Sequence, residues 1–181
     1  MEPTALPEVL VVRHPVHADS RGLFEELHRE ARLAAAGLSA RLVQVNHSRS
    51  GPGVLRGLHF QHPRAQAKLV SVLRGRVYEV AVDVRAGSPR YGRWAALTLT
   101  EGDGRQLWVP PGFAHGFCVV GDVAADVVYA VTAPWAPEHE RVVAWDDPAL
   151  AIPWPLEAPR LSARDAAAPP LSALRAAAQL P

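Results

Sequence analysis

The chain has 181 residues, is 49% hydrophobic and carries a formal net charge of +1, a balance typical of one globular domain. It has no basic tract of the kind that binds nucleic acid, no apolar run near the roughly 20 residues of a membrane span, and no signal-like start in MEPTALPEV. A single cysteine, Cys118, excludes an internal disulfide. We therefore expect one cytoplasmic domain over residues 1–181, without nucleic-acid or membrane partners.

The N-terminal part of the chain alternates between extended and turn signals. EVLVVR (8–13) is typical of a first strand, ADSRG (18–22) of a turn, and residues 23–27 continue extended. Residues 29–36 are rich in Ala, Arg and Leu and precede Gly37, which predicts a short helix with a glycine C-cap.

Further short strands follow from apolar runs and alternation, over 42–47, 54–61, 68–73, 77–84, 94–100, 106–109, 115–120, 126–132 and 141–145. Arg74-Gly75 predicts a hairpin turn between 68–73 and 77–84. From about residue 155 a C-terminal segment rich in Ala, Pro and Arg predicts two short helices, near Ser162 and Leu171. Many short strands with little helix predict a mainly β sandwich or barrel.

Strand parity predicts that three polar side chains face the interior. His59, Lys68 and Tyr129 fall on the apolar faces of their strands, whereas Arg56 falls on the face opposite to His59. Buried polar groups need partners, and several together are commoner at a functional site than in a plain core.

Lys68 is the only lysine among nineteen basic side chains. A chain so biased toward arginine is expected to use arginine wherever positive charge alone suffices, whereas a lysine ammonium can direct one compact charge at one oxygen. Taken alone, this observation does not decide between a functional lysine and a chance of composition.

Seven stretches resemble, in order, the dTDP-4-dehydrorhamnose 3,5-epimerase family. They are DSRGLFEE (19–26), QVNHSRS (44–50), GVLRGLHFQ (53–61), QAKLV (66–70), VAVDVRAGSPRYGRW (80–94), RQLWVPPGFAHGF (105–117) and LSARDAAAP (161–169). Each string is weak by itself, but seven in register over residues 19–169 are specific.

The resemblance implies a cupin jelly roll that forms a homodimer, in which N-terminal strands of one subunit complete the site of the other. It implies a dTDP-linked 4-keto-6-deoxyhexose as substrate, no cofactor and no metal. The ketone of such a sugar acidifies the carbons on both sides of it, so epimerisation requires a base, a stabiliser for the enolate oxygen and an acid on the opposite face.

By motif match, His59 resembles the base, Asp165 the carboxylate that orients it, Lys68 the cation at the enolate oxygen and Tyr129 the acid. Substrate contacts are implied for a second set: Arg21 and Arg56 at the diphosphate, Gln44 and Asn46 as polar contacts, Phe24 and Trp135 as aromatic contacts, together with Glu26 and His115.

Several of these residues also fit plain structural roles. His59 and Tyr129 are compatible with a core, His115 with a supporting position, and Arg21 and Arg56 with surface charges. Asp165 lies three residues after Ser162, the spacing of a helix capping box, so capping and catalysis are both compatible with it.

Two departures from the family pattern bear on specificity. Position 79 is Glu where the family usually has Asp, and position 135 is Trp where tyrosine is frequent. Either change is compatible with a relative that epimerises only C3 or only C5 in antibiotic-sugar pathways, so that alternative stays open.

Two other functional classes remain as rivals. A metal-dependent cupin, such as a dioxygenase, needs two or three histidines with a carboxylate, but the sequence offers only His59 and His115, with Gln61 and Gln66 in the expected ligand region. A non-catalytic sugar-nucleotide binding module would keep the arginines and lose the acid and base.

Overall fold

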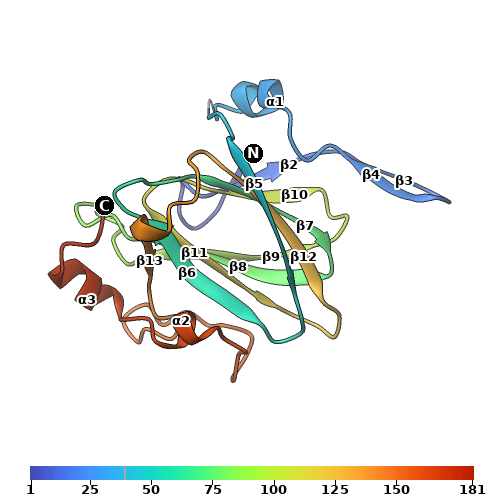
Figure 1. Cartoon of the computed structure of the whole chain (residues 1–181). Helices are drawn as coiled ribbons and strands as arrows, with labels where there is room; N and C mark the ends of the chain where they lie inside the picture. The colour runs from blue at the N-terminus through green and yellow to red at the C-terminus, as the bar shows by residue number, and fades with distance from the viewer. Residues whose placement is uncertain (39) are drawn as a thin grey trace.

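The computed structural model describes residues 1–38 and 40–181, and its body is a sandwich of two antiparallel sheets (Figure 1). One sheet has the order β1 (Glu2–Pro3), β2 (Leu10–Arg13), β10 (Arg105–Val109), β7 (Lys68–Arg74), β12 (Ala125–Val131) and β5 (Gln44–Ser50). The other has the order β13 (Glu140–Val142), β6 (Leu55–Gln61), β11 (Phe113–Val119), β8 (Arg76–Asp83) and β9 (Trp94–Thr100). The predicted mainly β architecture with few short helices is confirmed.

The main core lies between the two sheets. It joins Val70 and Val72 of β7 to buried residues of the opposite sheet such as Val77, Leu99 and Phe117. Burying a large apolar side chain contributes roughly 1.5–3 kcal/mol, so this contact holds the sheets face to face. Val70 and Val72 confirm the interior face that strand parity assigned to the strand beginning at Lys68.

The outer face of the five-stranded sheet is covered by the C-terminal segment. The two predicted helices are present there, as α2 (Ala163–Ala166) and α3 (Leu171–Ala176). Leu58 and Phe60 of β6 share a buried cluster with Leu171 and Leu174 of α3. This packing anchors the segment against the sheet that carries His59.

The helix α1 (Glu30–Ala35) matches the predicted short helix and covers part of the six-stranded sheet. Leu33 is its fully buried residue and shares a cluster with Trp108 of β10. A 3-10 turn, η1 (Pro137–His139), precedes β13. None of the helices in the described ranges is long and apolar enough to cross a membrane.

The predicted hairpin between residues 68–73 and 77–84 is wrong, because the two strands belong to different sheets. β7 pairs with β10 and β12, whereas β8 pairs with β9 and β11. The chain passes from one sheet to the other at Gly75, which has φ 75°. A Cβ atom there would lie 2.9 Å from the carbonyl oxygen of Ala124. Two apolar runs joined by a short turn with glycine occur both in a hairpin and where a chain crosses from one sheet to the other, so the local sequence does not distinguish the two.

A separate two-stranded hairpin, β3 (Val16–Asp19) and β4 (Gly22–Glu25), projects from the body (Figure 1). The turn predicted over 18–22 is confined to Ser20 and Arg21. At the base of the hairpin, the buried imidazole of His14 lies 2.8 Å from a carboxylate oxygen of Glu25. The hairpin therefore has one specific contact that fixes it to the end of β2.

Candidate active site

A cavity of about 280 Å³ is lined by side chains from both sheets. It contains three of the four predicted catalytic residues. Its lining residues are Ser48, Arg56, His59, Lys68, His115, Phe117, Tyr129, Trp135 and Glu140.

The fourth predicted catalytic residue, Asp165, contacts this cavity through His59. Its Oδ1 lies 2.7 Å from Nε2 of His59, and the two residues are 106 positions apart in the sequence. Asp165 is held at the start of α2, where its N–H donates to Oγ of Ser162 at 3.1 Å. Asp165 thus takes part in the helix N-cap and orients the histidine, so both interpretations of this residue are compatible with the geometry.

The electrostatics of Asp165 favour its charged form. Burial acts to raise the pKa of the carboxyl group, but hydrogen bonds from His59, Ser162 and the backbone of Gly57 lower it overall. A carboxylate at this position fixes the ring of His59 and leaves the opposite edge of the imidazole available to the cavity.

Arg56 lines the same cavity as His59, so the parity prediction that put them on opposite faces is wrong. The reason is a β-bulge between β6 and β11. His59 pairs with His115, and Arg56 pairs with Phe117. Two residues of β6 therefore face the single residue Gly116, which shifts the alternation by one.

The bulge requires glycine at position 57. Gly57 has φ 135°, and a Cβ atom on it would lie 2.5 Å from Cα of Gly116. The glycine in the GVLRGLHFQ motif therefore lets β6 and β11 approach closely while both Arg56 and His59 point inward.

Lys68 begins β7 and is buried, with its ammonium directed at the cavity wall. Its Nζ donates to the carbonyl oxygen of His59 at 3.2 Å. Burial lowers the pKa of the Lys68 ammonium to about 8, and the charges of Glu140 and Glu79 oppose that decrease. Near neutral pH, Lys68 is thus a cation that loses its proton readily.

Tyr129 lies on β12 and packs against the core between the sheets, which confirms its predicted interior face. Burial and the charge of Glu140 raise the pKa of its phenol, and Arg56 opposes the increase. The hydroxyl is therefore protonated at neutral pH and available as a donor.

His115 forms a second histidine–carboxylate pair with Glu79, the residue at which the chain departs from the family pattern. Nε2 of His115 lies 2.6 Å from Oε2 of Glu79, and both side chains are buried. Burial lowers the pKa of His115 despite the charge and hydrogen bond of Glu79. The imidazole is therefore neutral at neutral pH and lines the cavity.

Gln44, Asn46 and Trp135 are joined by hydrogen bonds near the cavity. Nε2 of Gln44 donates to Oδ1 of Asn46 at 2.7 Å, and its Oε1 accepts from the backbone N–H of Trp135 at 3.0 Å. The Trp135 residue lines the cavity and is 54% exposed. Its ring is thus available to a ligand.

Arg21, Phe24 and Glu26 do not join the cavity within this chain. The Arg21 side chain is 87% exposed and pairs with Asp19, and Phe24 is 70% exposed on the β3–β4 hairpin. Glu26 follows the hairpin, and its carboxylate binds Arg29 and Arg32. None of these three predicted contacts lines the cavity that contains His59.

A second hollow of about 360 Å³ continues the site beyond the His59–Asp165 pair. It shares Arg56, His59 and Glu140 with the first cavity and adds Arg160 and Arg164. Sequence reasoning did not single out Arg164 or Glu140. Arg164 adjoins Asp165 in the LSARD motif, which is a usable signal, whereas Glu140 follows PEH in a loop-like segment without any such signal.

Over residues 1–38 and 40–181, no group of three or more His, Cys, Asp or Glu side chains is arranged to hold an ion. The two histidines of the cavity instead each contact one carboxylate.

Comparison with known proteins places the whole chain in a family. The sequence profile described as dTDP-4-dehydrorhamnose 3,5-epimerase matches residues 3–173. The chain belongs to the dTDP-4-dehydrorhamnose 3,5-epimerase family. This family consists of isomerases, and the resemblance seen in the sequence motifs is confirmed.

Relatives in this family are similar over most of the chain. A dTDP-4-dehydrorhamnose 3,5-epimerase of Pseudomonas aeruginosa is 48% identical over 163 residues, which cover 89% of this chain and 90% of the relative. One from Neisseria gonorrhoeae is 51% identical over 165 residues, which cover 91% of this chain but 50% of that longer relative.

Solved structures of epimerases share the fold. A dTDP-6-deoxy-D-glucose-3,5-epimerase from Legionella pneumophila, in complex with dTDP-4-keto-L-rhamnose, has a TM-score of 0.94 and 45% identity, covering 99% of this chain and 96% of that one. A 3'-monoepimerase from Streptomyces bikiniensis, in complex with dTDP-quinovose, has a TM-score of 0.92 and 33% identity, covering 100% and 92%. These likenesses confirm the predicted cupin-type fold.

Proposed function

We propose that this chain epimerises dTDP-4-dehydro-6-deoxy-D-glucose at C3 and C5, giving dTDP-4-dehydro-L-rhamnose for rhamnose biosynthesis. The observation that carries the proposal is the arrangement of His59, Lys68 and Tyr129 around one cavity, with Asp165 bonded to His59. Membership of the epimerase family supports the same reaction.

The proposed chemistry proceeds through an enolate. His59, oriented by Asp165, removes the proton from a carbon next to the C4 ketone. The oxygen that becomes negative is stabilised by the Lys68 ammonium. Tyr129 then delivers a proton to the opposite face of the carbon, which inverts it. His59 gives up the removed proton and the Tyr129 phenolate regains one by exchange with water, and the same sequence at the second carbon completes the reaction.

The nucleotide end of the substrate is proposed to lie along the arginines of the second hollow. Arg56, Arg160 and Arg164 supply the forked donors that suit a diphosphate. The Legionella pneumophila enzyme, which is similar over nearly its whole length, was solved with a dTDP-sugar. This supports a dTDP-sugar as the ligand of the present chain.

The reaction is tested by NMR of dTDP-4-keto-6-deoxyglucose in D2O with the enzyme, coupled to a 4-ketoreductase that traps the product. We expect deuterium at both C3 and C5 and an L-rhamno product. Failure of wild-type enzyme to incorporate deuterium at either carbon would overturn the proposal and favour a different sugar nucleotide or a binding module.

A single-site 3- or 5-epimerase is the second candidate. Trp135 and Glu79 are the departures that favour it, since Trp135 lines the cavity and Glu79 holds His115 there. The similarity to a 3'-monoepimerase points the same way. Deuterium at one carbon only would select this candidate, and restoring Tyr at 135 and Asp at 79 would then identify which departure matters.

We also propose a homodimer in which the β3–β4 hairpin completes the site of the partner. In one chain the hairpin stands clear of the body, with Phe24 and Arg21 exposed. An exposed aromatic ring and a guanidinium fit the base and diphosphate of a nucleotide. The proposed location is the cytoplasm, with which the free thiol of Cys118 is compatible.

Mixing two inactive variants tests the shared site. Arg21→Ala damages the hairpin and His59→Ala damages the cavity, so each homodimer should be inactive. Refolded mixtures should regain part of the activity, because a heterodimer has one site with neither change. A monomeric mass by light scattering, or no recovery on mixing, would contradict this arrangement.

A further inference from the structure

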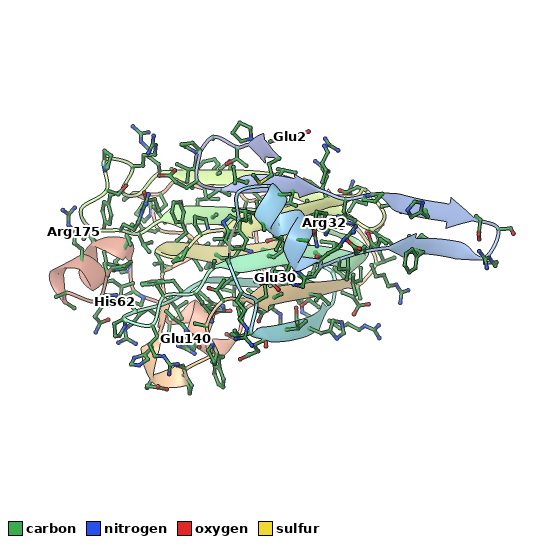
Figure 2. The ribbon with its side chains drawn as sticks, turned by 90° about the horizontal axis from the view of Figure 1, so that it is seen from above. Glu2, Glu30, Arg32, His62, Glu140 and Arg175 are labelled. Atoms are coloured by element: carbon green, nitrogen blue, oxygen red, sulfur yellow. The ribbon has the colours of Figure 1, made fainter. Side chains whose placement is uncertain are left out.

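Glu140 occupies the junction between the two hollows of the site. It is the first residue of β13 and pairs with Gln61 of β6. Its side chain lines both the cavity that contains Lys68 and the hollow that contains Arg164. Figure 2 shows Glu140 beside α2 and well away from the β3–β4 hairpin. No role follows for this residue from the sequence motifs.

On the side of the second hollow, Glu140 binds Arg164. Its Oε2 forms an ion pair with Nη1 of Arg164, and its carbonyl oxygen accepts from Nη2 at 3.3 Å. The Glu140 side chain is largely buried, whereas that of Arg164 is half exposed. A carboxylate in this position fixes the guanidinium next to Asp165, on the rim where the diphosphate is proposed to bind.

On the side of the cavity, Glu140 contributes a compensating negative charge for Lys68. Within the described residues, Lys68 donates only to a backbone carbonyl, that of His59. Charged and titratable groups face this ammonium from every neighbouring element: Arg56 and His59 on β6, Glu79 on β8, His115 on β11, Tyr129 on β12 and Glu140 on β13. Glu79 already bonds to His115, which leaves Glu140 as the carboxylate that lines the cavity itself.

We propose that Glu140 is a positioning residue that couples the two ends of the site: its carboxylate holds Arg164 for the diphosphate and keeps the Lys68 ammonium charged for the enolate. The inference rests on the epimerase function proposed above and assigns this residue a part in it. Glu140 does not touch the reacting carbons, and it acts through Lys68 and Arg164.

The physical consequence is a link between substrate binding and the charge of Lys68. Glu140 raises the pKa of Lys68 against the effect of burial, and it also raises the pKa of Tyr129. When a bound diphosphate shares Arg164 with Glu140, the guanidinium neutralises the Glu140 carboxylate less. Its effect on Lys68 and Tyr129 then increases, so both groups hold their protons more firmly in the complex.

The single lysine makes a direct test possible. Protein labelled with ¹³C at the ε-carbon of lysine gives one side-chain signal, from Lys68, whose chemical shift reports deprotonation as the pH is raised. In wild-type protein the midpoint is expected at about 8. In Glu140→Gln it is expected to fall by roughly 0.5–1 pH unit, because a buried cation loses an opposite charge.

Arg164→Gln is the matched control. It removes the cation that neutralises Glu140, so the midpoint of Lys68 is expected to rise. Combining Glu140→Gln with Arg164→Gln separates the effect of the carboxylate on Lys68 from the effect of the guanidinium. If Glu140 acts on Lys68 directly, the Lys68 midpoint of the double variant stays below the wild-type value. Glu140→Asp keeps the charge and should give a midpoint between those of wild type and Glu140→Gln, which also covers the case in which Glu140→Gln fails to fold.

Kinetics supply a second readout. Glu140→Gln should shift the alkaline limb of kcat for deuterium exchange to lower pH by the same amount as the Lys68 midpoint. Arg164→Gln should instead raise KM for the dTDP-sugar and move that limb to higher pH, in line with the expected rise of the Lys68 midpoint.

An unchanged Lys68 midpoint in Glu140→Gln would overturn the inference. The titration needs no substrate, so that result is distinct from failure of the epimerase function, which would be revealed by wild-type enzyme that exchanges no deuterium.

Discussion

The site contains two histidine–carboxylate pairs whose histidines face each other on neighbouring strands. The pairs differ in the element that supplies the carboxylate and in their exposure to solvent. His59 and His115 are paired opposite each other on β6 and β11. The partner of His59 is Asp165, on a helix outside the sheet, whereas the partner of His115 is Glu79, on the adjacent strand β8. One pair spans 106 residues of sequence and the other spans 36.

Exposure separates the two pairs. The side chain of His59 is 29% exposed and that of His115 is 7% exposed. A base must reach its substrate, so the more accessible imidazole is suited to proton transfer. The buried imidazole of His115 is held neutral by desolvation and is suited to shaping the wall beside Lys68. A histidine with a carboxylate partner is thus suited to proton transfer in one pair and to a structural role in the other, because the two imidazoles differ in exposure.

The largest expected effect comes from replacing the accessible histidine. His59→Asn should lower deuterium exchange into the dTDP-sugar by about 10²–10⁴-fold, because it removes the proposed base. Binding of dTDP, measured by calorimetry, should change little. Exchange at the wild-type rate would remove His59 as the base and reverse the comparison between the pairs.

Replacing Lys68 should have the second-largest effect on the rate. Its ammonium donates to the backbone carbonyl of His59, and the charge of Glu79 acts to raise its pKa. Lys68→Arg keeps the charge but replaces one compact donor by a planar fork, so the rate should fall by roughly 10²-fold. Wild-type activity should also decline as the pH rises through about 8, where Lys68 loses its proton. A fully active Lys68→Arg enzyme would make the lone lysine an accident of composition.

Asp165→Asn tests the carboxylate of the accessible pair. The N–H of residue 165 still donates to Ser162, so the start of α2 is preserved. The amide no longer stabilises or orients the imidazole as the carboxylate does, and kcat should fall by roughly 10–100-fold. The denaturation midpoint serves as the control and should stay near wild type. A large loss of stability with normal kcat would assign Asp165 to capping alone.

Glu79→Gln tests the buried pair and should have the smallest effect on the rate. It removes a buried charge that accepts from His115, so the free energy of unfolding should decrease by about 1–3 kcal/mol. Exchange at pH 7 should remain within a few-fold of wild type. Loss of exchange with unchanged stability would show that the buried pair, too, takes part in the chemistry.

The sequence predicted most of this site because the motifs are local. His59, Lys68 and Tyr129 each lie within a short strand whose neighbours are apolar, and Asp165 lies in a helix start with Ser162 as its cap. Each of these features is visible within about five residues. They predicted the mainly β fold and the C-terminal helices, whereas the pairing of His59 with Asp165 was implied by the resemblance of the motifs to the family.

The predictions that were wrong depend on how strands meet. Alternation along β6 put Arg56 opposite His59, but the bulge at Gly57 brings both into one cavity. A hairpin was expected at Gly75, where the chain crosses between sheets. Both outcomes are set by contacts with distant backbone, at Gly116 and Ala124, that no local pattern reports.

By itself, the sequence determined which side chains are proposed for the chemistry, because the resemblance of its motifs to the family points to a base, a cation, an acid and an orienting carboxylate. Only the tertiary structure decided which histidine is accessible, that His115 contacts Glu79, and that Glu140 lies between Arg164 and Lys68. The physical reason is that burial, and with it the charge of each group, depends on strands and helices that are far apart in the chain.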